Sequence, residues 1–410
     1  MTEISEPAPE ATKRAAAKKL FAHFSLRRFL GWLHLWTGII FCIPFVLLGI
    51  SGSVLMMGHN LPARFEANPA AEQFKSAAEI IAAAKAIAPE GRIASAYDAP
   101  AKEGDPAIVR FAAPRRDGAQ AGGPPPRPAA QTRVLVDPIT LEAKIDPPPG
   151  LGQGQGGFNF MRLMHDMHGR MLIEGAPGRQ FVGWLGVLMC GLGLSGIVMW
   201  WPRPGQWQAA FKVRLGQSAL RVNRELHGAV GVWGLIVFMI VSFSGVYIVF
   251  PQTINGWVDA SPAVRDARNQ QPFVVTPIEG AAALDADGAV ALAKEAIADG
   301  VVRAITLPAN PEQPYRVAMS RIGDQTGVPR ATVIVDPWRK KVAEVRDPAA
   351  YGPVDKFLAF QRQLHAGYTL GIIWWVLVFV IGFLPLLFVG TGLAMWLLKR
   401  RNKRRVAAQA

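Results

Sequence analysis

Four long uncharged stretches decide what this chain can fold into. They run from Gly31 to Met57, from Phe181 to Trp201, from Leu226 to Phe250 and from Gln363 to Leu398. A helix needs about 20 residues to cross a hydrocarbon core of about 30 Å, and each stretch is long enough. Half of the chain is hydrophobic and only 18% of its residues are charged. The sequence therefore predicts a multi-pass membrane protein instead of a soluble enzyme.

The positive charge of the chain indicates how the spans are oriented. Residues 1–30 carry six Lys and Arg against three acids, residues 202–224 carry five against none, and residues 399–410 carry six against none. The long connections 58–180 and 251–362 are close to balanced, with 14 cations against 13 acids and 13 against 13. An excess of Lys and Arg marks the cytoplasmic side of a membrane. We therefore expect both termini in the cytoplasm, and the net charge of +14 needs no nucleic-acid partner to explain it.

These counts give a domain plan for the whole chain. It has a cytoplasmic leader (1–30), four spans (31–57, 181–201, 226–250 and 363–398), two outer domains (58–180 and 251–362), a basic cytoplasmic connection (202–225) and a cytoplasmic tail (399–410). The two cysteines, Cys42 and Cys190, both lie in apolar runs. They form neither a disulfide framework nor a Cys-x-x-Cys motif, which argues against zinc ribbons, iron–sulfur clusters and covalently attached haem.

The sequence repeats itself. His34-Leu-Trp-Thr-Gly38 is matched by His227-Gly-Ala-Val-Gly231, and a Ser-Gly pair follows 17 residues after each histidine, at Ser51 and Ser244. The second and fourth spans end alike, at Ser195-Gly-Ile-Val-Met-Trp200 and Thr391-Gly-Leu-Ala-Met-Trp396. The repeat predicts an internal duplication, in which a span, an outer module and a second span occur twice. The fold class expected is a membrane four-helix bundle with two outer α+β modules.

Each outer module combines a helix with short strands. The helical patterns are Ala70 to Ala88 and Gly288 to Asp299. Strand patterns follow at 107–112 and 133–136 in the first module and at 315–319 and 332–335 in the second, each pair closed by an Asp-Pro turn.

Six of the seven histidines lie within or beside the spans, where ionisable groups are costly enough to suggest function. His34 and His227 open the first and third spans at the expected cytoplasmic end, and we call them the inner pair. On the other side His168 precedes the second span and His365 opens the fourth, and we call them the outer pair. His165 lies three residues before His168 on the same side. If the outer pair ligates a haem, His165 is either the ligand in place of His168 or a partner for a haem propionate. His23 and His59 fit surface segments better.

Two imidazoles that face each other from equivalent helices match the axial ligands of a six-coordinate haem. Gly38 and Gly231 lie one turn beyond the inner histidines, where a missing side chain lets a porphyrin approach the backbone. In the competing interpretation each histidine only bonds a neighbouring helix. A zinc or copper site would need further ligands, and the spans offer no carboxylate or cysteine cluster.

Several of these motifs together resemble the PepSY-associated transmembrane family, whose members include iron-regulated inner-membrane proteins and ferrisiderophore reductases. The resemblance covers about residues 27 to 403 and is carried by His168-Gly-Arg-Met-Leu172, Pro177-Gly-Arg179, Ser195 to Arg203, the two Val-Asp-Pro turns and Gln363 to Gly367. It implies four membrane helices in the bacterial inner membrane, two periplasmic PepSY modules, and b-type haems with axial ligands at His34, His227, His168 and His365. It also implies that electrons cross the membrane to reduce ferric iron in siderophore chelates.

We therefore expect a haem-dependent ferric-chelate reductase that holds two haems b. No Gly-x-Gly-x-x-Gly follows a strand, so the electrons must come from a separate cytoplasmic donor or from quinol. The basic connection either lies on the anionic lipid bilayer or docks that donor. Outer arginines such as Arg321 either attract an anionic chelate or are ordinary solvated surface; the others are Arg115, Arg116 and Arg127.

Two other functions compete with this one. In the first, the outer modules are peptide-binding or protease-binding regulators on a membrane anchor, which predicts a colourless protein. A metal or siderophore transporter is the other alternative, and it predicts polar residues and broken helices near the bilayer midplane. Pro44 and Pro385 are the candidates for such breaks.

Overall fold

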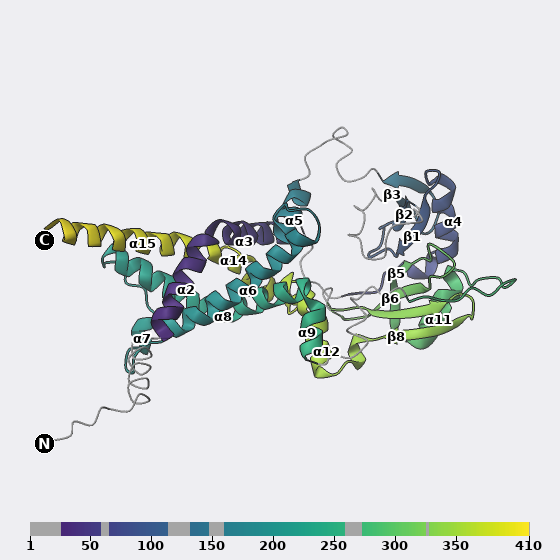
Figure 1. The fold of residues 1–410 in the computed structure, drawn as a ribbon. Helices are drawn as coiled ribbons and strands as arrows, with labels where there is room; N and C mark the ends of the chain where they lie inside the picture. Colours follow the sequence, from purple (N-terminus) through teal and green to yellow (C-terminus); the bar gives the residue numbers. More distant parts are fainter. Residues whose placement is uncertain are drawn as a thin grey trace, which may run out of the picture.

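The computed structural model describes residues 26–58, 65–113, 132–146, 160–258, 273–324 and 328–409. Within these ranges the chain forms a group of long apolar helices and one antiparallel sheet, which occupy opposite ends of the molecule (Figure 1). The predictions for His23, His59, Arg115, Arg116 and Arg127 fall outside the described residues.

Three described helical stretches are long and apolar enough to cross a membrane. They are α6 (Gly175–Trp200), α8 (Ala219–Val249) and the stretch formed by α14 (Gly371–Ile381) and α15 (Leu384–Gln409). Helices α2 (Leu26–Ile40) and α3 (Cys42–Met57) make a fourth if this bent pair is one span. The predicted membrane class is therefore supported, although the helices extend past several predicted ends, because hydropathy marks the apolar part of a helix and not its termini.

The first predicted span is bent. The axes of α2 and α3 differ by 68° across Phe41. Pro44 lies three residues after the break and has no N–H to donate to the carbonyl of Ile40, so the helical ladder is interrupted there. Pro44 was one of the two prolines predicted to break a helix, and the structure has the break between α2 and α3 close to it.

The last stretch is also interrupted, between α14 and α15. Pro385 cannot donate to the carbonyl of Ile381, and the N–H of Phe383 bonds Val380 instead of Phe379. The hydroxyl of Ser53 on α3 donates to the freed carbonyl of Phe379 at 2.8 Å. A Cβ added to Gly49 would lie 2.2 Å from the carbonyl oxygen of Gly382, so glycine is needed where α3 crosses this break.

Helix α8 contacts α6, α14 and α15, and α3 contacts α15 and α14. An apolar core fills the space between these helices, made by Phe45, Leu48, Leu185, Met189, Phe238, Ile381 and Leu384. Its members lie along each helix between the positions of the inner and outer histidines, so the two pairs are separated by apolar side chains.

Short helices occupy both ends of the apolar group. Between it and the sheet lie α5 (Phe160–Arg170), α9 (Pro251–Trp257) and α12 (Pro353–Ala359), with η2 (Pro348–Ala350) before α12 and α13 (Gln361–His365) after it. At the far end lie α7 (Trp207–Ala210), the beginning of α2 and the end of α15 (Figure 1). The described basic segments therefore gather at the end that is remote from the sheet.

The two outer modules share one sheet. Its strands run in the order β4-β3-β2-β1-β5-β6-β7-β8, and every neighbouring pair is antiparallel. The first four are β1 (Ile93–Asp98), β2 (Ala107–Ala112), β3 (Thr132–Val136) and β4 (Ala143–Asp146). The second four are β5 (Gly300–Thr306), β6 (Tyr315–Arg321), β7 (Ala331–Asp336) and β8 (Lys341–Arg346). The sequence treated the modules separately, but β1 pairs with β5 and joins them edge to edge.

Helices α4 (Ala77–Ile87) and α11 (Ala286–Ala296) lie on the side of this sheet that is remote from the apolar helices (Figure 1). Both modules contribute to a single apolar core beneath them, which includes Ile80, Phe111, Ile305 and Val333. The Oδ1 of Asp287 on α11 accepts the backbone N–H of Ala78 at 3.0 Å, which ties the two helices together. The sheet and its helices therefore form one body.

The two predicted Asp-Pro turns have the same hydrogen bonds. Asp137 Oδ1 accepts the N–H groups of Ile139 and Thr140, and these bonds lower the pKa of the Asp137 carboxyl. Asp336 Oδ1 accepts the N–H groups of Trp338 and Arg339 in the second module. Each carboxylate thus satisfies the backbone of the turn that follows it. An η1 turn, Ala71–Gln73, precedes α4.

Candidate functional site

The structure brings four of the predicted histidines together in two pairs. His34 on α2 and His227 on α8 have ring centroids 6.2 Å apart. His168 on α5 and His365 on α13 have ring centroids 5.8 Å apart. The members of each pair come from different halves of the chain, so each pair bridges the two halves.

Hydroxyl groups hold the rings of the inner pair. His34 Nδ1 lies 2.9 Å from Ser195 Oγ, and His227 Nδ1 lies 2.8 Å from Thr391 Oγ1. Ser195 donates to the carbonyl of Gly191 at 2.8 Å, and Thr391 donates to that of Leu387 at the same distance. Because each hydroxyl has only one proton, we assign the ring Nδ1–H as the donor to the hydroxyl oxygen.

Backbone carbonyls hold the rings of the outer pair. His168 Nδ1 lies 2.9 Å from the oxygen of Leu48, and His365 Nδ1 lies 2.9 Å from that of Val241. The hydroxyls of Ser51 and Ser244 are also in reach, at 3.5 Å and 3.1 Å. A carbonyl can only accept, so Nδ1 carries the proton in both rings. In all four histidines Nε2 is then the nitrogen with a free lone pair.

Glycines decide how closely the outer rings approach the helices. A Cβ added to Gly52 would lie 2.8 Å from His168 Cε1, and one added to Gly245 would lie 3.1 Å from His365 Cε1. The corresponding distances inside are longer, 3.6 Å from Gly196 to His34 and 3.9 Å from Gly392 to His227. The outer rings therefore rest directly on glycine backbone, and this contact brings a main-chain carbonyl within reach of Nδ1.

The other predicted residues lie around these pairs. A Cβ on Gly38 would meet no atom within 4 Å, and one on Gly231 would meet only the Phe388 ring, at 3.8 Å. Phe388 packs against the ring of His227 with centroids 5.0 Å apart. His165 has an exposed side chain 3.8 Å from the Asp166 carboxylate. It is thus His168, and not His165, that meets His365 in this structure.

The donor set fits a haem better than a bare metal ion. Among the described residues no group of three or more His, Cys, Asp or Glu side chains is arranged to hold a metal. Two imidazoles alone leave a tetrahedral zinc site incomplete. A metal bound at about 2 Å by each of two facing imidazoles separates their ring centroids by roughly 6 Å, as observed for both pairs. A macrocycle would supply the remaining ligands.

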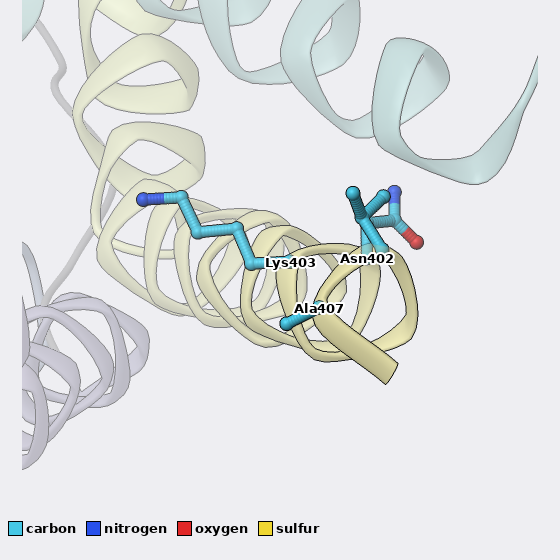
Figure 2. Close-up of a pocket in the computed structure, with 4 residues that line it drawn as sticks. Asn402, Lys403 and Ala407 are labelled. Carbon is cyan, nitrogen blue, oxygen red and sulfur yellow. The ribbon is translucent and has the colours of Figure 1, made fainter. Parts of the chain in front are cut away.

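Two hollows on the described surface lie away from these histidines. One, of about 410 Å³, is lined by Asn402, Lys403, Val406 and Ala407 on the last turns of α15 (Figure 2). The other, of about 420 Å³, lies between α4 and α11 and is lined in part by Pro308, Tyr315 and Trp338. The one described arginine among the suggested anion-attracting residues, Arg321, is paired with Asp299 and Asp347.

The sequence did not identify the partners of the histidines. Ser51, Ser195, Ser244 and Thr391 stood out only because they repeat in front of a glycine. The available signal was that these residues repeat at equivalent positions in the two halves of the sequence. Residues that repeat together with the histidines are expected at the same depth in the membrane as each other. Which acceptor each histidine ring uses depends on how the helices cross, and the sequence spacing of these residues does not determine the crossing.

Comparison with known families places the chain in one of them. Residues 31–399 match the model of the PepSY-associated TM region family. The chain belongs to this family. The match covers the apolar helices, the shared sheet and all four paired histidines of this PepSY-associated protein. A search of curated proteins found no match.

Proposed function

We propose that this PepSY-associated membrane protein binds two b-type haems and passes electrons across the bacterial inner membrane to ferric iron in siderophore chelates. The observation that carries the proposal is the presence of two imidazole pairs at the separation that shared axial ligation requires, each ring held through Nδ1. His34 and His227 would hold one haem, and His168 and His365 the other. Bound haem supplies one-electron redox chemistry, and the protein supplies its position and surroundings.

The separation of the two pairs supports an electron route along the membrane helices. His227 and Val241, whose carbonyl holds His365, lie 14 residues apart on α8, which corresponds to about 21 Å along a helix. Apolar side chains such as Phe238 and Met189 fill the intervening space. They keep water and ions out of the region that an electron must cross, so a leak of protons along the same route is disfavoured.

The orientation follows from charge. The beginning of α2, the connection that contains α7 and the end of α15 carry the basic residues and lie remote from the sheet (Figure 1). We propose that this end is cytoplasmic and that the sheet, with its two PepSY modules, is periplasmic. A haem held by the inner pair would then lie toward quinol or a cytoplasmic donor, and a haem held by the outer pair would lie toward the ferric chelate.

The proposed reaction moves one electron from the reduced donor to Fe(III) in the chelate and leaves Fe(II). Hard oxygen ligands bind Fe(II) far less tightly than Fe(III), so reduction releases the iron. A duplicated half, consisting of two spans and one PepSY module, accounts for the equivalent roles of Ser195 and Thr391 and for the symmetric strand order.

The direct test is the visible spectrum of the protein purified in detergent, before and after dithionite. We expect a Soret band, a reduced α band and haem b extractable into pyridine at about two per chain. Reduction of a ferric hydroxamate by the dithionite-reduced protein, followed by trapping of Fe(II), tests the substrate class. A colourless protein from cells grown with ample iron and haem precursor would contradict the proposal.

A peptide-binding role is the second candidate, and the hollow between α4 and α11 favours it. Pro308, Pro311, Tyr315 and Trp338 line this hollow, and aromatic and proline side chains are common where extended peptides bind. In this function the histidines would only bond neighbouring helices. The same spectrum separates the two functions, because the peptide-binding protein would contain no haem.

A further inference from the structure

The two histidine pairs use different kinds of hydrogen-bond acceptor. Each outer ring donates from Nδ1 to a main-chain carbonyl, with a serine hydroxyl as a second neighbour. Each inner ring has a side-chain hydroxyl as its hydrogen-bond partner, from Ser195 or Thr391. A hydroxyl can be removed by substitution, whereas a main-chain carbonyl cannot.

The acceptor on Nδ1 matters to a metal bound at Nε2. A hydrogen bond from Nδ1–H fixes the ring orientation and makes the imidazole a more basic ligand. A more basic ligand stabilises the more highly charged ferric state over the ferrous state. Loss of the acceptor therefore raises the reduction potential of the bound centre.

The local structure makes the two inner hydroxyls suitable for this task. Both residues are buried: Ser195 is 8% exposed and Thr391 is 6% exposed. Each is fixed by donating to the carbonyl four residues earlier, so its lone pairs point away from its own helix and toward the histidine. The oxygen is thus a preoriented acceptor and not a freely rotating group.

We propose that Thr391 and Ser195 are positioning residues that orient His227 and His34 and set the reduction potential of the inner centre, whereas Ser51 and Ser244 are dispensable for the outer centre. This inference rests on the proposed haem-binding function. It assigns the larger effect to Thr391, because the Leu192 carbonyl also lies close to His34 and can partly replace Ser195. His227 has no such carbonyl partner among the described residues.

The experiment is a spectroelectrochemical titration of the full-length protein in detergent, with the two centres resolved by their α bands. Thr391→Val removes the hydroxyl at nearly constant shape. We expect the reduction potential of one centre to rise by about 59 mV, which for one electron corresponds to a change of about tenfold in the equilibrium between its ferric and ferrous states. The reduction potential of the other centre should not change. Ser195→Ala should shift the same centre less, and Thr391→Ser should restore the original value.

Matched controls are provided by the outer site. Ser244→Ala and Ser51→Ala remove the equivalent hydroxyls but leave the carbonyls of Val241 and Leu48, so neither potential should move. Unshifted potentials in Thr391→Val, or an equal shift in Ser244→Ala, would overturn the inference. If Thr391→Val loses one haem while Thr391→Ser keeps it, the hydroxyl is still the deciding group and the inference stands. A wild-type protein without haem is a different result, since it contradicts the proposed function itself.

Discussion

The inner and outer histidine pairs are built from the same sequence elements but depend on different atoms. In each case a histidine faces a small hydroxyl residue followed by glycine on another helix of its own half. Inside, the hydroxyl oxygen holds the ring and the glycine has room for a side chain. Outside, the glycine lets the ring rest on the backbone, and a main-chain carbonyl holds it.

The difference follows from where the histidines lie. The inner histidines belong to the long helices α2 and α8, which keep the rings a helix-packing distance from the neighbouring backbone. The outer histidines belong to the short helices α5 and α13, which can approach α3 and α8 closely. One dipeptide motif therefore supplies a side-chain contact in one place and a backbone contact in the other.

The largest expected effect comes from removing a ligand. His365→Ala and His168→Ala should each abolish the outer centre and leave about one haem per chain, and His34→Ala and His227→Ala should do the same to the inner centre. Pyridine haemochrome analysis and the reduced spectrum measure the loss. If the same spectral component disappeared from an inner and an outer variant, the two pairs would not be separate sites.

The next prediction concerns the difference in space beside the glycines of the outer and inner pairs. Gly52→Ala places a Cβ 2.8 Å from His168 Cε1 in the unaltered structure, so the ring or α5 must move, at about 1–3 kcal/mol. We expect a loss of outer haem and a lower melting temperature. Gly196→Ala introduces only a 3.6 Å contact, and alanine favours a helix over glycine by about 0.5–1 kcal/mol.

Haem content and thermal unfolding of Gly52→Ala and Gly196→Ala, measured side by side, check this prediction. Gly245→Ala, with its 3.1 Å contact, should lie between them. Equal behaviour of Gly52→Ala and Gly196→Ala would show that the outer rings do not rest on the backbone in the way described.

A smaller effect is expected at the predicted porphyrin contacts. A methyl group on Gly38 meets nothing within 4 Å in the protein alone, so Gly38→Ala should not destabilise the haem-free protein. If a macrocycle occupies that space, Gly38→Ala should weaken haem retention by about tenfold, comparable to loss of a supporting contact around a metal site. Haem transfer to apomyoglobin measures retention, and unchanged transfer would mean that the macrocycle does not approach this backbone.

The smallest effect is expected at His165. Its side chain is exposed beside Asp166 and does not face His365. His165→Ala should therefore keep both haems and both spectra, in contrast to His168→Ala. A loss of the outer centre in His165→Ala would exchange the roles of the two histidines, and haem content decides between them.

The sequence predicted much of this arrangement but not how its parts join. The four apolar stretches, the helices α4 and α11, and the strands predicted at 107–112, 133–136, 315–319 and 332–335 were visible because each is a local pattern of hydrophobicity. Strands β1, β4, β5 and β8 were missed, because short strands of mixed polarity have no distinctive pattern of their own. The bend at Phe41 was only suggested by Pro44, since a proline permits a kink without specifying its angle.

The same division applies to the histidine pairs. Their residue types, their recurrence at one spacing and the basic ends of the chain are properties of the sequence alone. These predicted His34, His227 and His365, together with His168 and its rival His165. The choice of His168 over His165, the pairing of β1 with β5, and the use of a hydroxyl inside but a carbonyl outside were decided only by the tertiary structure. Hydrophobicity and charge act residue by residue, whereas these contacts depend on how closely distant helices and strands approach, a distance that their packing determines.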